Sequence, residues 1–492
     1  MLTFYLGNGF PKLENNMKKQ TMTLLSLFSI ACLCSCNSEK PIIIEPDYYK
    51  DVESRAKFDN ENPLNFDEKM KNGLSNDTWL TLDGAWHTNV EGAEHNGVRS
   101  RNLFYTKDNE GNDLLAIKGR GKYYNEDSQN KNLPEGGCII SKEHLTPGRY
   151  EIEMASFPRV GAVTAMWTYC TTTGNEATSQ NEIDIELGGN AQYQEEWCTS
   201  WTKKNDKKTE SVNVGQKLDQ SLFFNDGKMH KFTFDWYTNY GEDGEARVDW
   251  FVDEKLIYSV DGSCVPTHAM PLWIGVWFPP LWAGVPLFNE DYLLIKNIKF
   301  TSFEDTQYFD SCRSEPGYTK KAINEANIQN IDYNKIKNIN KLSNGDFESI
   351  EQPLLNDYNG WIIDNTSKGK VILNDQKTLG SHSFELQAGE DSEDYHGEYL
   401  RQSISAAYPG FKYNLSIDAK KLNEASNGNI EIYQRNIGKA KIKKDVIKID
   451  SLDFKTYTKK IVMIEDAYEL EIDITSEDGS ILYDNASLIF EN

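Results

Sequence analysis

The apolar and polar residues of the chain alternate with a period of two in many short segments. Turn-forming residues bound these segments, and this pattern is typical of half-buried β-strands. Long amphipathic helical patterns are nearly absent, so the sequence predicts an all-β sandwich at residues 65–304. Its predicted strands are Leu114–Lys118, Tyr150–Ala155, Glu182–Leu187, Lys231–Trp236, Arg247–Asp253 and Tyr292–Phe300.

The alternation stops after the last of these strands and resumes further along the chain. Residues 305–340 are rich in Asn, Lys and Asp and contain the turn pair Pro316 and Gly317, which indicates a linker. Residues 341–492 again show short strands separated by turns, over about the usual length of one domain. We therefore predict a second β-sandwich, with strands at Phe384–Leu386, Lys412–Ile417, Ile430–Tyr433, Glu469–Ile474 and Ile481–Ile489.

Residues 1–36 have the pattern of a targeting segment. Lys18 and Lys19 precede an apolar run that is too short to span a bilayer, and Met17 is an alternative start. The run ends in a sequence that resembles the lipobox of bacterial lipoproteins, Leu33-Cys34-Ser35-Cys36. The resemblance implies that Cys36 is acylated, whereas a simple secretory peptide would need no cysteine there.

A lipid on Cys36 would make this protein an exported lipoprotein. The polar and acidic residues 37–64 are then expected to form a tether to the membrane. We expect a place on the outer membrane of a Gram-negative bacterium, on the cell surface, with the lipid as the only contact with the membrane.

Composition limits the partners of this chain. It has 492 residues and a net charge of −24, which repels the phosphate groups of nucleic acids and of anionic lipid surfaces. Aromatic residues make up 12% of the chain, which suits a surface that faces sugars as well as a packed core. We therefore expect a polysaccharide ligand, no nucleic acid and a monomeric protein.

The cysteines beyond the leader give no sign of a metal site. Their spacing contains no Cys-x-x-Cys pair and no neighbouring histidine cluster, so zinc is not indicated. An exported protein could oxidise a pair of them, but the sequence does not choose the pair. The five are Cys138, Cys170, Cys198, Cys264 and Cys312.

One predicted strand carries an unusual row of acids. Glu182, Asp184 and Glu186 alternate with aliphatic residues, so all three carboxylates share one face of the strand. Like charges so close together shift each other's pKa values apart, which is what a nucleophile and a general acid require. In a flat strand, residues four apart have Cα atoms about 13 Å apart at roughly 3.3 Å per residue. A retaining glycosidase needs its carboxyl groups about 5 to 5.5 Å apart, so the row predicts a concave sheet.

The chain contains a second, shorter copy of this alternation. Glu471 and Asp473 alternate with Ile472 and Ile474, but the last glutamate is missing and no tryptophan cluster lies nearby. We predict that this copy is a solvated surface. Alternation alone does not separate the two copies, so the surroundings of the first must do so.

Those surroundings resemble glycoside hydrolase family 16, in the form whose catalytic strand reads Glu-x-Asp-x-Glu without a bulge. The similarity covers residues 65–304, and the family implies a β-jelly-roll, a concanavalin A-like sandwich. Four further segments follow the family order: Gly148-Arg149-Tyr150-Glu151, Ala165-Met166-Trp167, Met229-His230-Lys231-Phe232 with Trp236, and Trp250-Phe251-Val252-Asp253.

The resemblance implies a retaining endo-β-glycanase. It makes Glu182 the nucleophile, Glu186 the general acid and base, and Asp184 the residue that tunes their charge. His230 is predicted to be a structural hydrogen-bonding residue. The predicted substrate-binding residues, for which core packing is the alternative role, are Glu151, Trp167, Tyr169, Trp201, Trp277 and Trp282.

Two departures limit what the resemblance implies. Glu153 stands where the family often has an arginine, which puts one hydrogen bond to sugar in doubt. Many members hold a calcium ion through an aspartate on the last strand, where this chain has Lys296, so we expect no cofactor and do not favour a structural calcium.

The C-terminal unit resembles carbohydrate-binding modules of families 4 and 22. The resemblance lies in its first and last strands, Asn344-Gly345-Asp346-Phe347-Glu348, Trp361 and Tyr483-Asp484-Asn485-Ala486-Ser487-Leu488. Glycan binding and a spacer role both stay open for it.

For the whole chain we expect a β-glucan hydrolase. The alternatives are a transglycosylase of the same fold and a surface glycan-binding lipoprotein without catalysis.

Overall fold

The computed structural model describes the chain in segments. These are residues 57–84, 97–124, 132–173, 179–188, 195–202, 208–213, 224–240, 245–279, 282–304, 306–313, 318–363, 369–389 and 398–491. The predicted leader, Cys36, most of the tether, and Pro316 with Gly317 lie outside them.

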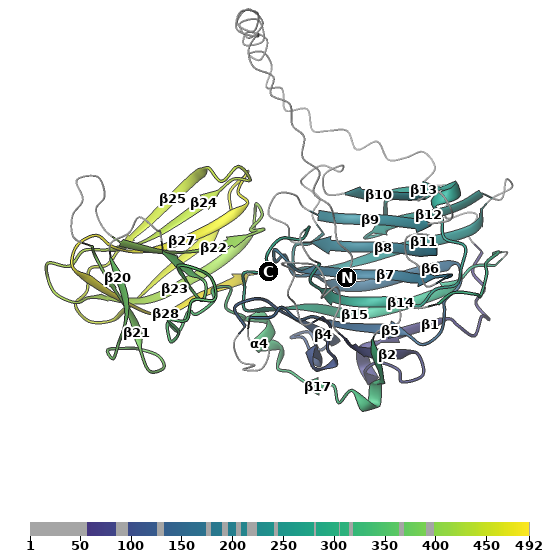
Figure 1. Ribbon diagram of the computed structural model, residues 1–492, viewed down its shortest axis with the longest axis horizontal. Helices are drawn as coiled ribbons and strands as arrows, with labels where there is room; N and C mark the ends of the chain where they lie inside the picture. Colours follow the sequence, from purple (N-terminus) through teal and green to yellow (C-terminus); the bar gives the residue numbers. More distant parts are fainter. Residues whose placement is uncertain are drawn as a thin grey trace, which may run out of the picture. The chain divides into compact units, whose positions relative to one another are not determined.

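The first part of the chain folds into two facing β-sheets. We name each sheet after one of its strands. The β6 sheet has the order β13-β12-β11-β6-β15-β4-β3-β17, with β1 also paired to β15, and the β8 sheet has the order β10-β9-β8-β7-β14-β5-β2-β16. Figure 1 shows β10, β9, β8, β7 and β14 side by side in the β8 sheet.

The bounds of these elements follow the sequence. The strands are β1 (Phe66–Lys69), β2 (Trp79–Asp83), β3 (Leu103–Lys107), β4 (Asp113–Arg120), β5 (Gly137–Ser141), β6 (Gly148–Ala155), β7 (Val163–Thr171), β8 (Gln180–Gly188), β9 (Glu195–Thr202), β10 (Lys208–Asn213), β11 (Met229–Tyr240), β12 (Glu245–Val252), β13 (Lys255–Asp261), β14 (Leu272–Trp277), β15 (Glu290–Ser302), β16 (Thr319–Ala322) and β17 (Gln329–Asn330). Short helices are η1 (Met70–Asn72), η2 (Ser100–Asn102), η3 (Gly262–Cys264), η4 (Ile323–Glu325) and α4 (Tyr333–Lys337).

The core of this sandwich lies between its two sheets. On β8 the aliphatic residues Ile183, Ile185 and Leu187 are buried there, and from the other sheet Trp236 and Trp250 are fully buried. Burying such a side chain stabilises the fold by about 1.5–3 kcal/mol. The alternation therefore assigns one face of each strand to the core, and the all-β prediction is confirmed.

The segment predicted as a linker is largely built onto this first sandwich. Strand β16 pairs with β2, and β17 pairs in parallel with β3. After them, Ile336 and Ile339 pack with Ala116 and Tyr292 in a small apolar cluster. The segment is therefore a connection with its own place in both sheets, which its polar sequence did not indicate.

A disulfide adds a covalent tie to the same connection. Cys170 on β7 is bonded to Cys312, with Cα atoms 5.9 Å apart and 142 residues between them in sequence. Beside it, Thr171 and Arg313 exchange two backbone hydrogen bonds of 2.8 Å. At the other end of the domain Phe58, from the predicted tether, forms a bridge with Phe303 and packs on its ring at 5.3 Å.

The second part of the chain is another sandwich of two sheets. The β27 sheet has the order β18-β19-β22-β27-β24-β25, and the β28 sheet the order β20-β21-β28-β23-β26. The strands are β18 (Asp357–Tyr358), β19 (Trp361–Ile363), β20 (Lys370–Asn374), β21 (Ser383–Gln387), β22 (Glu398–Ser405), β23 (Lys412–Lys421), β24 (Asn429–Arg435), β25 (Lys441–Lys448), β26 (Lys455–Val462), β27 (Glu469–Ser476) and β28 (Ser480–Glu491).

Trp361 anchors the core of the second sandwich. Its side chain is 0% exposed and stacks on Phe347 with ring centroids 5.3 Å apart. Its indole nitrogen donates a hydrogen bond to the backbone oxygen of Asn344 at 3.2 Å. This tryptophan is therefore a core residue and offers no ring to a sugar.

Candidate active site

The acid row of β8 lies between two strands that carry aromatic residues. In an antiparallel pair, residues directly opposite each other share a face of the sheet. The three rows across β7, β8 and β9 are Tyr169–Glu182–Trp201, Trp167–Asp184–Thr199 and Ala165–Glu186–Trp197. The fold thus brings the predicted acids together with Trp167, Tyr169 and Trp201 on one face of the β8 sheet.

The three acids differ in their exposure. Glu182 and Glu186 are half-buried, whereas Asp184 between them is only 4% exposed. Burial raises the pKa of Asp184 well above its usual range, and the charges of Glu182 and Glu186 raise it further. Asp184 therefore carries a proton at neutral pH and can donate it in a hydrogen bond.

Hydrogen bonds fix the acids from above and below. Asp184 bonds to Glu182 and to the indole of Trp201, and Gln180 donates a hydrogen bond to the carboxylate of Glu182. From the β6 sheet, Trp250 Nε1 donates to the backbone oxygen of Asp184 at 3.0 Å. A buried tryptophan of the core thus sets the height of the acid row on its sheet.

The predicted aromatic residues divide into two groups. Trp167 and Tyr169 are 7% and 6% exposed, and both contact the ring of Trp273, which Trp167 stacks on at 5.7 Å. Trp201, Trp277 and Trp282 are half-buried, so they keep exposed ring surface. Trp277 and Trp282 contact each other with centroids 6.2 Å apart.

Sequence reasoning missed two tryptophans of this face. Trp197 lies directly opposite Glu186, and Trp273 lies opposite Trp167 on β14. The signal for Trp197 was present, because it has the same strand parity as Trp201, four residues later. Trp273 could not be placed without knowing that β14 pairs with β7.

Glu151 was predicted to bind substrate and does not lie on this face. It belongs to β6, in the other sheet, and its neighbours Tyr150 and Ile152 point into the core between the sheets. Its side chain therefore points to the outer face of the β6 sheet, where it pairs with Lys231 Nζ at 2.7 Å and Lys299 Nζ at 3.4 Å. The strand resemblance was informative about sequence order and not about the face.

His230 makes two ion-paired hydrogen bonds. Its Nδ1 lies 2.7 Å from Asp253 and its Nε2 lies 3.1 Å from Asp226. Burial alone would lower the pKa of His230, but these two carboxylates raise it to about 9. Both ring nitrogens are engaged and the ring is protonated at neutral pH, which fits a structural residue better than a base.

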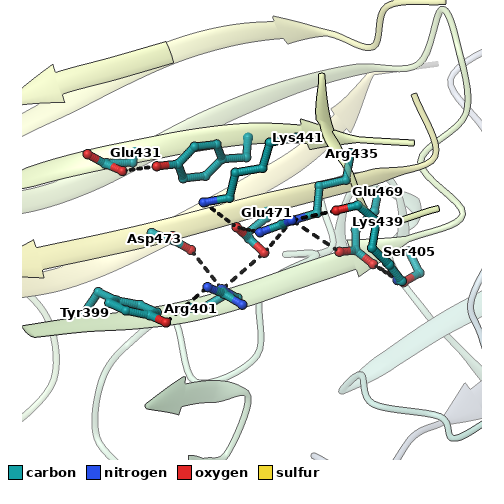
Figure 2. A network of polar contacts seen from close by, with 11 residues as sticks. Tyr399, Arg401, Ser405, Glu431, Arg435, Lys439, Lys441, Glu469, Glu471 and Asp473 are labelled. Carbon is teal, nitrogen blue, oxygen red and sulfur yellow. Dashed lines mark hydrogen bonds and ion pairs between the residues drawn. The ribbon is translucent and has the colours of Figure 1, made fainter. Parts of the chain in front are cut away.

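The second acidic strand is not a solvated surface, contrary to our prediction. Glu469, Glu471 and Asp473 on β27 are 5%, 1% and 5% exposed. Figure 2 shows cationic side chains from the neighbouring strands lying over them. Arg435 donates two hydrogen bonds to Glu471, at 2.9 and 2.7 Å, and Arg401 lies between Glu471 and Asp473 at 3.1 and 3.4 Å.

This covering network also explains the charge state of the second row. Burial raises the pKa of Asp473 to about 7, and Glu471 raises it too, while Arg401 acts in the opposite direction. Arg401 lies over the ring of Tyr399, and Lys441 lies over another tyrosine on β24. The row is an internal ion-pair network, which its sequence alone did not reveal because the cations come from other strands.

The described residues give no sign of a metal ligand set. Lys296, at the position where the family has a calcium ligand, pairs with Glu153 at 3.1 Å. No three His, Cys, Asp or Glu side chains among the described residues are grouped to hold a metal ion. The described part of the chain also has no helix long and apolar enough to cross a membrane.

Comparison with known proteins places a family on the first sandwich. Residues 93–285 match the model of glycosyl hydrolases family 16. This segment is therefore a family 16 domain, and the family is one of endo-acting glycosidases. No curated protein matches the chain.

Several solved structures of glycosidases are similar to this chain. A β-glucanase of Bacillus licheniformis is 21% identical, covers 48% of this chain and 98% of its own, and has a TM-score of 0.35. The endo-1,3-β-glucanase catalytic domain of Thermotoga petrophila is 18% identical, covers 49% and 97%, and has a TM-score of 0.37. A family 16 endo-glucanase from Bacteroides ovatus is 14% identical, covers 48% and 99%, and has a TM-score of 0.35.

Proposed function

We propose that this protein is a retaining, endo-acting hydrolase of a β-linked polysaccharide, with a β-glucan as its substrate. The observation that carries the proposal is the acid row of Glu182, Asp184 and Glu186. It lies on one face of the β8 sheet, in rows with aromatic side chains, inside the segment that matches family 16.

In this proposal Glu182 is the nucleophile. Gln180 donates a hydrogen bond to its carboxylate, and the protonated Asp184 is a second donor. Two donors favour the ionised form of a carboxylate and hold its orientation. Glu182 then attacks the anomeric carbon, the glycosidic C–O bond breaks, and a glycosyl ester forms on the enzyme.

Glu186 serves as general acid and then as general base. It gives its proton to the departing oxygen in the first step, which leaves it ionised. In the second step it takes a proton from water, which attacks the ester and releases the sugar with its original configuration. Both steps return Glu182 and Glu186 to their starting protonation states.

The half-buried tryptophans are the proposed platforms for sugar rings. Trp201 shares a row with Glu182, and Trp277 and Trp282 form a contacting pair on the neighbouring part of the sheet. Indole rings bury apolar surface against the C–H faces of sugars while leaving hydroxyl groups to polar side chains. Trp167 and Tyr169, which are more deeply buried, support this face from below.

Two alternative functions share the acid row with the hydrolase and differ from it in the fate of the glycan. A transglycosylase would pass the ester to an acceptor sugar in place of water. A surface glycan-binding protein would hold the polymer without cutting it. All three acids are present at their places on β8, which favours catalysis over binding alone.

We also propose that the protein is held at the outer membrane by a lipid on Cys36. The support is the sequence of the leader, whose last residues resemble a lipobox. Replacing Cys36 with Ser should release the protein from the membrane fraction of cells in which the wild type stays bound. Retention of the variant would exclude the anchor.

Product profiling tests the proposed activity. The protein is incubated with mixed-linkage glucan, xyloglucan, laminarin, agar-type galactan and mucin glycans, beside Glu182→Ala. Glu153→Ala, which removes an acid of the β6 sheet, is the matched control. Oligosaccharides released by the wild type and the control only, with retained anomeric configuration, are expected. Cleavage that survives in Glu182→Ala would remove that residue from the mechanism, and binding without cleavage would favour the glycan-binding alternative.

A further inference from the structure

A hollow lies at the edge of the β6 sheet, on a different sheet from the acid row. It has a volume of about 580 Å³, within the range of small-ligand sites. Its walls come from three segments that are far apart in sequence: the 3-10 helix η1, the hairpin of β3 and β4, and the connection at residues 330–333. Its polar lining includes Asn72, Tyr105, Lys107, Asp113, Asn330 and Tyr333.

The walls of the hollow are fixed in place. Gly73 has a φ of 72°, and a Cβ there would lie 2.9 Å from the ring of Tyr105, so the turn after η1 requires glycine. The hydroxyl of Tyr105 accepts a hydrogen bond from the backbone nitrogen of Leu74 at 3.0 Å. Opposite, Ile331 donates its backbone N–H to the backbone oxygen of Tyr105 at 2.9 Å, and Asp332 caps α4, where Tyr333 begins. A preformed hollow costs a ligand little ordering of the protein.

The lining is polar and close to neutral. Lys107 is paired with Asp113 at 2.8 Å, so its charge is already compensated. Asn72 and Asn330 are exposed and offer both donors and acceptors. Burial raises the pKa of Tyr333, and the charges of Asp108 and Glu110 raise it further, so negative charge already lies close to the hollow.

These features select a neutral ligand rich in hydroxyl groups. An anion would meet the carboxylates near Tyr333 and no uncommitted charge at Lys107. An apolar ligand would leave the amides and the ion pair without water. A sugar has hydroxyl groups for the amides and a C–H face for the ring of Tyr333 or Tyr105.

We propose that this hollow is a second glycan-binding site, which holds a neutral stretch of the polysaccharide away from the acid row. The identity of the polymer rests on the proposed function. A chain held at both sites is presented to the acid row at a raised effective concentration. The second site should therefore matter for long polymers and not for short oligosaccharides.

Variants at Tyr333 test this second site in the full chain. Tyr333→Ala removes the ring, Tyr333→Phe keeps it, and Tyr308→Ala is the control because Tyr308 is a 40% exposed tyrosine that does not line the hollow. Retention of each protein is measured by electrophoresis in gels that contain each polymer of the panel. KM and kcat are measured on the polymer that is cut and on a short oligosaccharide of it.

Tyr333→Ala should bind the polymer roughly three- to tenfold more weakly, the effect of one aromatic contact. Its KM for polymer should rise while kcat, and both constants for the short oligosaccharide, stay unchanged. Tyr333→Phe and Tyr308→Ala should resemble the wild type. If Tyr333→Ala lowers the melting temperature, Asn72→Ala gives the decision, with the same expected loss of retention.

Equal retention of the wild type, Tyr333→Ala and Asn72→Ala on every polymer overturns the second site, and so does a wild type that no polymer retards. These outcomes are separate from failure of the proposed function. A protein that cuts no polymer but loses retention in Tyr333→Ala has the second site without the activity. A protein that cuts a polymer with identical constants in all variants has the activity without the second site.

Discussion

The disulfide between Cys170 and Cys312 should contribute a large share of the stability of the first sandwich. It closes a loop whose ends are 142 residues apart in sequence. Closing a loop of this length removes about 17 cal/mol/K of entropy from the unfolded chain, or about 5 kcal/mol at 25 °C. Cys170→Ser with Cys312→Ser should therefore lower the free energy of unfolding of this domain by about 2–5 kcal/mol, the usual measured range.

Urea unfolding followed by tryptophan fluorescence measures this loss. The wild type is compared with the double variant, each with and without reductant, because reductant should destabilise the wild type alone. The backbone hydrogen bonds between Thr171 and Arg313 remain in the variant, so its native fold and activity at 25 °C should persist. A loss below about 1 kcal/mol, or free thiols at both positions in the purified exported protein, would refute the reasoning.

Four further predictions concern single side chains. Glu186→Ala should lower kcat by about 10²- to 10⁴-fold, as loss of a general acid and base does, and Glu182→Ala by more, which steady-state kinetics on the polymer measures. Asp184→Asn should keep more activity than Asp184→Ala, because the amide can still donate a hydrogen bond to Glu182; equal losses would contradict a protonated Asp184. Trp361→Ala should destabilise the second sandwich by about 3–5 kcal/mol, seen as a lower urea midpoint for its transition. The pKa of His230 is about 9 in the folded protein against 6.5 ordinarily, so its stabilising effect is complete below pH 6.5 and is lost as pH rises through about 9. The difference in unfolding free energy between wild type and His230→Gln should shrink over that window, and a constant difference would rule out the charge effect.

The period of two along the chain predicted which residues share a face, and the structure bears this out. Strand β8 extends the predicted segment by two residues at its start and one at its end, and its acids and aliphatics alternate between faces. The period did not say which sheet a strand joins. Glu151 was misplaced for this reason, because β6 pairs with β11 and β15 and belongs to the opposite sheet.

Non-local pairing also hid other features from the sequence. Strands β16 and β17 are four and two residues long and mostly exposed, so they lack the alternation of a buried strand and resemble a linker. The partner of Cys170 lies 142 residues away, and no local pattern selects it among the other cysteines. Edges and cross-links of a β-fold depend on register, which is set only when the chain has folded.

The two acidic strands show how register separates chemistry from structure. Directly opposite Asp473 on β22 lies Arg401, and directly opposite Glu469 on β24 lies Arg435. Opposite Asp184 lie Trp167 and Thr199, which carry no charge. Carboxylates that face guanidinium groups are neutralised by hydrogen bonds and are held as part of the fold.

Carboxylates that face aromatic rings interact mainly with one another, and this raises the pKa of the middle acid. The same sequence alternation therefore gives an ion-pair network on β27 and, on β8, a row whose proton can move. The residues opposite a strand, rather than the strand's own sequence, decide between these two outcomes. This is why the aromatic rows across β7 and β9 are stronger support for catalysis at Glu182 and Glu186 than the alternation itself.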